Sequence, residues 1–211
     1  MTTLIIIRHG LTEYNIENRI QGHLDTALTQ EGLDQAEQAA EYIADHYNID
    51  AIYSSDLSRA MNTAKPLAKR FELPIHPERD LRELCLGHWE GLLYAEGAVL
   101  YPETAAKRKE NPALVRYDGG ESFEDLGERA LRAVTRIAEE NDGKTVAIAS
   151  HGGTIRALLC LWHGRPISET YEIPAVPNTA INVVTYENGE FTILNENVTE
   201  HLTRLTVANV E

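Results

Sequence analysis

Two histidines in this chain each follow a short apolar run, and both stand among residues that could bind an anion. His9 is preceded by Arg8, and His151 is followed by Gly152. A neutral imidazole is a good nucleophile at physiological pH, and a guanidinium group can donate two parallel hydrogen bonds to phosphate oxygens. These residue types therefore indicate phosphoryl transfer with a covalent step on histidine.

A third cation, Arg59, could complete such a site. It follows another short apolar run, residues 50–53, and stands at the expected start of a helix, which disfavours a purely electrostatic structural role. Phosphoryl transfer needs positive donors around the equatorial oxygens, and the helix expected after His151 would add backbone N–H groups that favour anions. Together these groups could replace a metal ion.

Short apolar runs alternate with segments of helical periodicity, which predicts an α/β fold: a three-layer α/β/α sandwich with a mostly parallel central sheet. Ligands bind outside the carboxyl ends of the strands in such sheets. His9, Arg59 and His151 should therefore meet at one edge of the sheet. The expected strands are residues 4–7, 50–53 and 145–149, and the expected helices begin near residues 29, 57, 122 and 154.

Cap residues mark two of these helices. Thr29 can cap the first, and Ser122 with Asp125 three residues on has the pattern of a capping box. Pro66 should kink or break the helix that begins near residue 57. The apolar positions expected to face the core in the first helix are Leu33, Ala36, Ala40, Ile43 and Tyr47.

Turn-forming residues predict the structure of two other segments. Prolines and the pair Gly119-Gly120 interrupt residues 74–120, where we expect loops and short helices. Asn188-Gly189 separates two strand-like segments and predicts a closing hairpin.

The composition is that of a soluble globular protein, and 211 residues fit a single domain, residues 1–211. No apolar run approaches the roughly 18 residues that a membrane helix needs. A formal net charge of −14 makes nucleic acid and anionic lipid poor partners, because both bind clustered Lys and Arg. The oligomeric state cannot be read from the sequence.

The N-terminus has no basic segment and no small-residue cleavage site of an export signal. Cys85 and Cys160 are isolated thiols, so a reducing, cytoplasmic location fits best. The histidines show no metal-binding spacing, and we expect neither a metal nor another cofactor.

Several ordered segments together resemble the histidine phosphatase superfamily, whose founding members are the phosphoglycerate mutases. The resemblance extends from Leu4 to about residue 160. It rests on Arg8-His9-Gly10-Leu11-Thr12-Glu13-Tyr14-Asn15, Arg19-Ile20-Gln21-Gly22, Asp25, Leu28-Thr29 with Gly32, Ser54-Ser55-Asp56-Leu57-Ser58-Arg59-Ala60, Leu81-Arg82-Glu83, Gly87, Trp89-Glu90-Gly91 and Ser150-His151-Gly152-Gly153.

The resemblance implies a role for each matching residue. His9 would carry the phosphoryl group, and Arg8, Arg59 and His151 would form the phosphate pocket. Glu83 would protonate the leaving alcohol and later activate water. Substrate binding would also involve Asn15, Gln21, Gly22 and the backbone around Gly152.

Alternatives remain for individual residues. A surface ion pair is the other interpretation of Glu83, because Arg82 and Glu90 nearby are equally chargeable. Trp89 is more typical of a core than of a ligand platform. His23 and His88 could line the substrate side of the pocket.

Three functions are compatible with this pattern. A metal-independent phosphomonoesterase acting on small phosphorylated metabolites fits best, because Gln21-Gly22 with Asp25 resembles the phosphatase branch and the segment between Glu83 and His151 is short. A cofactor-dependent phosphoglycerate mutase and a catalytically silent binding module are the alternatives. Leu11 stands where the family often has Glu, which makes a transfer of substrate from relatives unsafe.

Overall fold

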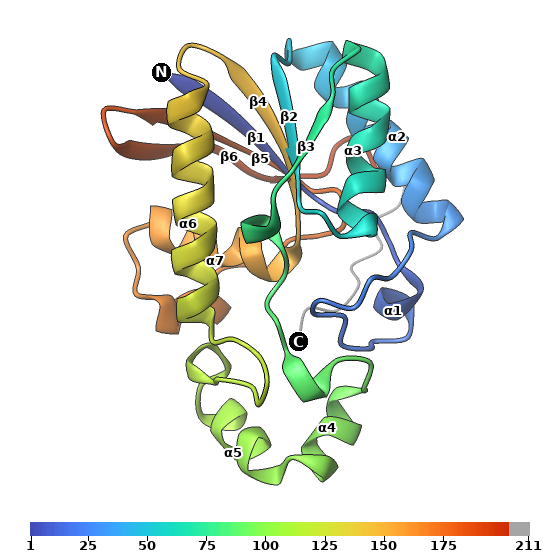
Figure 1. The fold of residues 1–211 in the computed structure, drawn as a ribbon, viewed down its shortest axis with the longest axis vertical. Helices are drawn as coiled ribbons and strands as arrows, with labels where there is room; N and C mark the ends of the chain where they lie inside the picture. The colour runs from blue at the N-terminus through green and yellow to red at the C-terminus, as the bar shows by residue number, and fades with distance from the viewer. Residues whose placement is uncertain (203–211) are drawn as a thin grey trace.

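The computed structural model describes residues 1–202 and contains one six-stranded sheet in the order β3-β2-β4-β1-β5-β6 (Figure 1). β3, β2, β4 and β1 are parallel, whereas β5 runs antiparallel to β1 and β6 antiparallel to β5. The prediction of a mostly parallel sheet is confirmed. The strands are β1 (Thr2–Arg8), β2 (Ala51–Ser54), β3 (Ile75–Pro77), β4 (Thr145–Ser150), β5 (Ile181–Glu187) and β6 (Glu190–Val198).

Four long helices cover the two faces of the sheet: α2 (Gln30–His46) and α3 (Ser58–Phe71) on one, α6 (Phe123–Glu140) and α7 (Gly152–Trp162) on the other. The alternating side chains of β1 show this division. Ile5 and Ile7 pack with residues of α2 and α3, while Leu4 and Ile6 pack with residues of α6 and α7. The three-layer α/β/α architecture is therefore confirmed.

The expected caps are present. The Thr29 hydroxyl accepts a hydrogen bond from the Gly32 N–H at 3.0 Å, and Ser122 and Asp125 form a reciprocal capping box. Leu33, however, is 41% exposed, so its expected core position is wrong. It lies at the edge of the buried stripe of α2, which is centred on Ala36, Ala40 and Ile43.

Two further sequence expectations concern Pro66 and the C-terminal hairpin. α3 continues through Pro66, so the expected break is wrong; both Pro66 and Leu67 are buried. The hairpin forms as predicted, and Asn188 and Gly189 have the positive φ angles, 54° and 88°, of its turn.

Residues 74–120 form loops and short helices, as expected. They include α4 (Tyr94–Leu100) and α5 (Pro102–Glu110), which lie beyond the carboxyl edge of the sheet (Figure 1). This part packs around Trp89, which is buried and contacts the rings of Tyr94, Tyr101 and Tyr117. Trp89 is therefore a core residue. The remaining short elements are α1 (Glu13–Ile16) and the 3-10 helices Arg79–Leu81, Gly87–Trp89, Pro112–Leu114 and Ile167–Glu172.

No helix within residues 1–202 is long and apolar enough to cross a membrane. The predicted single domain, residues 1–211, includes residues 203–211, which lie outside the described residues.

Candidate active site

The register of the sheet brings the ends of three strands together. Arg8 at the end of β1 pairs with Ser150 at the end of β4, and Ser54 at the end of β2 pairs with Ala149. His9 directly follows β1 and His151 directly follows β4, so the two rings lie side by side, with their centroids 5.3 Å apart. The convergence predicted from the strand order is confirmed for these two rings.

A cavity of about 270 Å³ opens at this edge of the sheet. Of the nine predicted site residues, eight line it: Arg8, His9, Asn15, Gln21, Gly22, Arg59, Glu83 and Gly152. The ninth, His151, is fully buried beside His9 and does not line the cavity itself.

His9 is oriented for attack through one ring nitrogen. Its Nδ1 lies 2.7 Å from the Gly10 carbonyl oxygen, which can only accept, so Nδ1 carries the proton and Nε2 has the free lone pair. Burial, together with the positive charges of Arg59 and Arg8, holds the pKa of His9 well below its usual range. The ring is therefore neutral and nucleophilic at neutral pH.

Arg8 and Arg59 place two buried positive charges at the cavity. Arg8 donates to the Val176 carbonyl at 2.6 Å, and the Nε of each guanidinium is buried without a hydrogen-bond partner among the described residues. Neither has a carboxylate within 4.0 Å in the part of the chain that the structure describes. Burial lowers the pKa of each to about 10, which leaves both charged at neutral pH. An unpaired buried charge is costly, and a bound anion would compensate it.

Arg59 also shapes the loop that follows α1. Its guanidinium donates to the carbonyl oxygens of Gly22 and Leu24, both at 2.8 Å. Gly22 has a φ of 52°, and a Cβ at this position would meet the side chain of Glu90. The Oε1 of Gln21 accepts from Thr12 and Thr26, which turns its amide nitrogen towards other acceptors. Asn15 is also held by Thr12, since its Oδ1 accepts from the backbone N–H of that residue at 3.3 Å.

His151 is held by Ser55, which the sequence analysis did not single out. The Nε2 of His151 lies 2.8 Å from the Ser55 hydroxyl, and its Nδ1 is buried without a hydrogen-bond partner among residues 1–202. Burial, Arg59 and His9 keep the pKa of His151 well below its usual range. The ring is therefore neutral in the free protein.

Glu83 lies against the N-terminus of α7. Its carboxylate accepts hydrogen bonds from the backbone N–H groups of Gly153 at 3.0 Å, Thr154 at 3.1 Å and Leu84 at 2.9 Å. The neighbouring charges have other partners: Arg82 binds Asp56 at 2.6 Å, and Glu90 accepts from the backbone of His23. The surface ion pair considered for Glu83 is therefore wrong.

The remaining rim residues were only partly foreseen. His23 contacts the Glu83 carbonyl through Nε2 at 2.8 Å, and neither His23 nor His88 lines the cavity. Much of the outer wall is made of residues that no motif identified, because apolar and aromatic side chains at irregular spacing are typical of any core. These are Leu84, Leu86, Tyr94, Phe123 and Tyr171, with Asn18 and Arg156. Tyr14, Arg19, Ile20 and Gly153 also line the cavity and belong to segments on which the resemblance rests.

Among residues 1–202, no group of three or more His, Cys, Asp and Glu side chains is placed to hold a metal ion.

The geometry agrees with comparisons to known proteins. The chain is 35% identical over 189 residues to phosphoglycerate mutase-like protein 4 of Arabidopsis thaliana, covering 89% of this chain and 80% of that protein. It is 33% identical over 204 residues to the metal-independent phosphoserine phosphatase of the same plant, covering 96% and 84%. The solved structure of Bacillus stearothermophilus YhfR superimposes with a TM-score of 0.90 at 31% identity, covering 95% of this chain and 99% of that one. The family model described as histidine phosphatase superfamily (branch 1) matches residues 4–199, and the chain belongs to this superfamily.

Proposed function

We propose that the protein is a metal-independent phosphomonoesterase that acts on small phosphorylated metabolites through a phosphohistidine on His9. The observation that carries this proposal is the pairing of a neutral, oriented imidazole with two buried guanidinium groups that have no carboxylate partner, all lining one cavity. A phosphate dianion would supply the missing negative charge.

In the first step, the lone pair of His9 Nε2 forms a bond to phosphorus as the bond from phosphorus to the ester oxygen breaks. The departing oxygen takes up the electron pair of that bond and a proton from the carboxyl group of Glu83. The organic half of the ester therefore leaves as a neutral alcohol. Arg8, Arg59 and His151 Nδ1 would donate to the equatorial oxygens, which carry the charge in the transition state.

In the second step, a water oxygen bonds to phosphorus and the nitrogen–phosphorus bond breaks. Glu83, now a carboxylate, takes the proton of the attacking water, and inorganic phosphate leaves. His9 returns to its neutral form, hydrogen-bonded to Gly10 through Nδ1. Each bond broken is matched by one formed, and the proton that Glu83 gives to the alcohol in the first step is replaced by the proton of water in the second.

The phosphatase is favoured over the phosphoglycerate mutase. The name of the Arabidopsis relative at 33% identity, metal-independent phosphoserine phosphatase, supports hydrolysis without a metal. The apolar and aromatic residues of the outer wall support the same assignment, because they suit the alcohol half of an ester better than a second phosphate. The two arginines of this wall already have partners: Arg19 binds Glu17, and Arg156 donates to the carbonyl oxygens of Ile173 and Tyr171. The intact set of site residues argues against a silent binding module.

The substrate, the extent of the domain and the location belong to the same proposal. A cavity of about 270 Å³ suits a small metabolite rather than a macromolecule. We assign residues 1–211 to one domain, since a single sheet carries the site, and we place the protein in the cytoplasm, where Cys85 and Cys160 remain free thiols.

A screen of phosphorylated metabolites for released phosphate, carried out in EDTA, tests the proposal. We expect turnover of at least one monoester in the chelator, and an acid-labile phosphoprotein after rapid quenching. Activity that disappears in EDTA, or isomerisation of phosphoglycerate without phosphate release, would contradict it.

A further inference from the structure

Glu83 is carried by a segment without regular secondary structure. Residues 83–86 form neither helix nor strand, so no ladder of backbone hydrogen bonds fixes the position of this side chain. A proton donor must be held within hydrogen-bond reach of the departing oxygen in order to act. The contacts that hold this segment are therefore part of the catalytic design.

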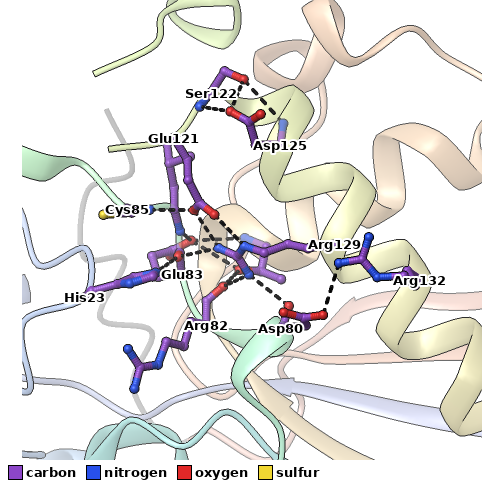
Figure 2. A network of polar contacts seen from close by, with 12 residues as sticks. His23, Asp80, Arg82, Glu83, Cys85, Glu121, Ser122, Asp125, Arg129 and Arg132 are labelled. Atoms are coloured by element: carbon purple, nitrogen blue, oxygen red, sulfur yellow. Dashed lines mark hydrogen bonds and ion pairs between the residues drawn. The ribbon is translucent and has the colours of Figure 1, made fainter. Parts of the chain in front are cut away.

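Arg129 of α6 binds the backbone leading into this segment at three carbonyl groups (Figure 2). Its Nη1 donates to the carbonyl oxygens of Asp80 and Arg82, and its Nη2 donates to the carbonyl oxygen of Glu83, all at 2.8 Å. The carbonyl groups on both sides of the Glu83 Cα are thus bound by a single guanidinium, which is only 9% exposed.

Glu121 fixes the guanidinium in turn. Its two carboxylate oxygens accept from Nε and Nη2 of Arg129 at 2.8 Å, and Oε2 also accepts from the backbone N–H of Cys85 at 3.0 Å. All five N–H donors of Arg129 are used. Burial opposes ionisation of Glu121, yet the bonds from Arg129 and Cys85 hold its pKa below the usual value, so the pair is charged.

We propose that Arg129 is a positioning residue for Glu83: the Arg129–Glu121 pair holds the backbone of residues 80–85 so that the Glu83 carboxyl group faces the departing oxygen. A lysine could not replace it, because an ammonium group has three donors and lacks the planar fork. The inference rests on the proposed acid role of Glu83.

Leaving groups of different basicity test this role. An alkyl phosphate needs a proton on its departing oxygen, whereas p-nitrophenyl phosphate releases a stable phenolate and needs much less help. For Arg129→Lys and for Glu121→Gln, we expect kcat/KM on the alkyl ester to fall about 10- to 100-fold. On p-nitrophenyl phosphate, the fall should stay within about threefold. The apparent affinity for inorganic phosphate should not change, because the phosphate-binding groups are untouched.

Arg132→Lys is the matched control. Arg132 lies one turn further along α6, its side chain is 68% exposed, and its one ion pair among the described residues is with Asp80, at 3.2 Å. We expect both substrates to be turned over as in the wild type. Thermal unfolding of all variants shows whether the fold is retained, and Glu121→Gln keeps the test available if Arg129→Lys does not fold.

Glu83→Gln separates the two possible failures. If Glu83→Gln loses activity selectively on the alkyl ester and the Arg129 and Glu121 variants do not, the positioning role is wrong. If Glu83→Gln shows no such selectivity, the acid role in the proposed function is wrong. An equal loss on both substrates in the Arg129→Lys variant would show a merely structural role.

Discussion

The rings of His9 and His151 lie edge to face, with their centroids 5.3 Å apart and their planes at 61°. Both rings are buried, and Arg8 and Arg59 lie close enough to lower the pKa of each. Four groups that could be positive therefore share one end of the sheet, but only the two guanidinium groups carry charge in the free protein. Neutral imidazoles reduce the repulsion among the four groups, and the proposed attack on phosphorus needs the free lone pair of a neutral ring.

The free energy of unfolding should fall in acid because of these two rings. Their folded-state pKa values are lowered, whereas in the unfolded chain both should be near 6.5. Their contribution is thus fully present above pH 6.5 and is lost as the pH falls, at about 1.4 kcal/mol per pH unit for each ring. Urea unfolding between pH 7.5 and 5 measures this slope.

The His9→Asn variant provides the comparison for the acid slope. It removes one titrating ring, so its slope below pH 6.5 should be smaller by about 1.4 kcal/mol per pH unit. Identical slopes for the two proteins would mean that His9 titrates normally in the folded state.

The nucleophile itself is tested by His9→Ala. We expect kcat to fall by roughly 10³-fold or more, since no other group in the cavity can take the phosphoryl group from its position. Rapid quenching with a labelled substrate should recover no phosphoprotein. His46→Ala, at an exposed histidine that packs on Tyr42, should behave as the wild type. If the His9→Ala protein still became labelled, the phosphoryl group would be carried by another residue.

Ser55 should matter through His151. Its hydroxyl is the only group among residues 1–202 that forms a hydrogen bond with the Nε2 of that ring, at 2.8 Å. Loss of one hydrogen bond between buried groups costs about 1.5 kcal/mol, so Ser55→Ala should lower kcat/KM about tenfold. Ser54→Ala is the matched control, because Ser54 is equally buried but donates to the Ser55 carbonyl at 2.8 Å. Equal effects of the two changes would remove the special role of Ser55.

Sequence patterns located the residues that follow strands, and for a physical reason. In a parallel sheet, the position of a residue at a strand end is set by local periodicity together with the strand order, so His9 and His151 could be placed from short segments. The caps at Thr29 and Ser122 are local in the same way. Leu33 was misplaced because periodicity does not fix the edges of a buried stripe.

Residues that act across long distances in the chain could not be found by that route. Arg129 binds the Glu83 carbonyl 46 residues away, and Ser55 binds His151 across 96 residues. No spacing in the sequence predicts either contact, because each depends on how α6 and the ends of the strands pack in the folded protein. The aromatic residues Tyr94, Phe123 and Tyr171 of the cavity wall could not be predicted for the same reason.

A close approach of two backbone segments anchors the loop that carries His9. A Cβ on Gly32 would collide with the backbone of Leu11, and one on Gly10 would collide with the backbone of Gly32. Backbone atoms cannot yield as a flexible side chain can, so Gly32→Ala should cost about 1–3 kcal/mol of stability, as overpacking does elsewhere. It should also lower kcat, because the loop that carries His9 must move.

Gly127→Ala is the matched control for this last effect. Gly127 is also helical, in α6, but a Cβ there would first meet the Cδ1 atom of Ile167 at 3.2 Å, the far end of a flexible side chain. Both changes gain about 1 kcal/mol of helix propensity, so the difference between them isolates the backbone collision. Urea unfolding should show Gly32→Ala as the less stable protein, with Gly127→Ala near or above the wild type. A Gly32→Ala protein of wild-type stability and activity would mean that α2 and the loop after β1 can separate without disturbing His9.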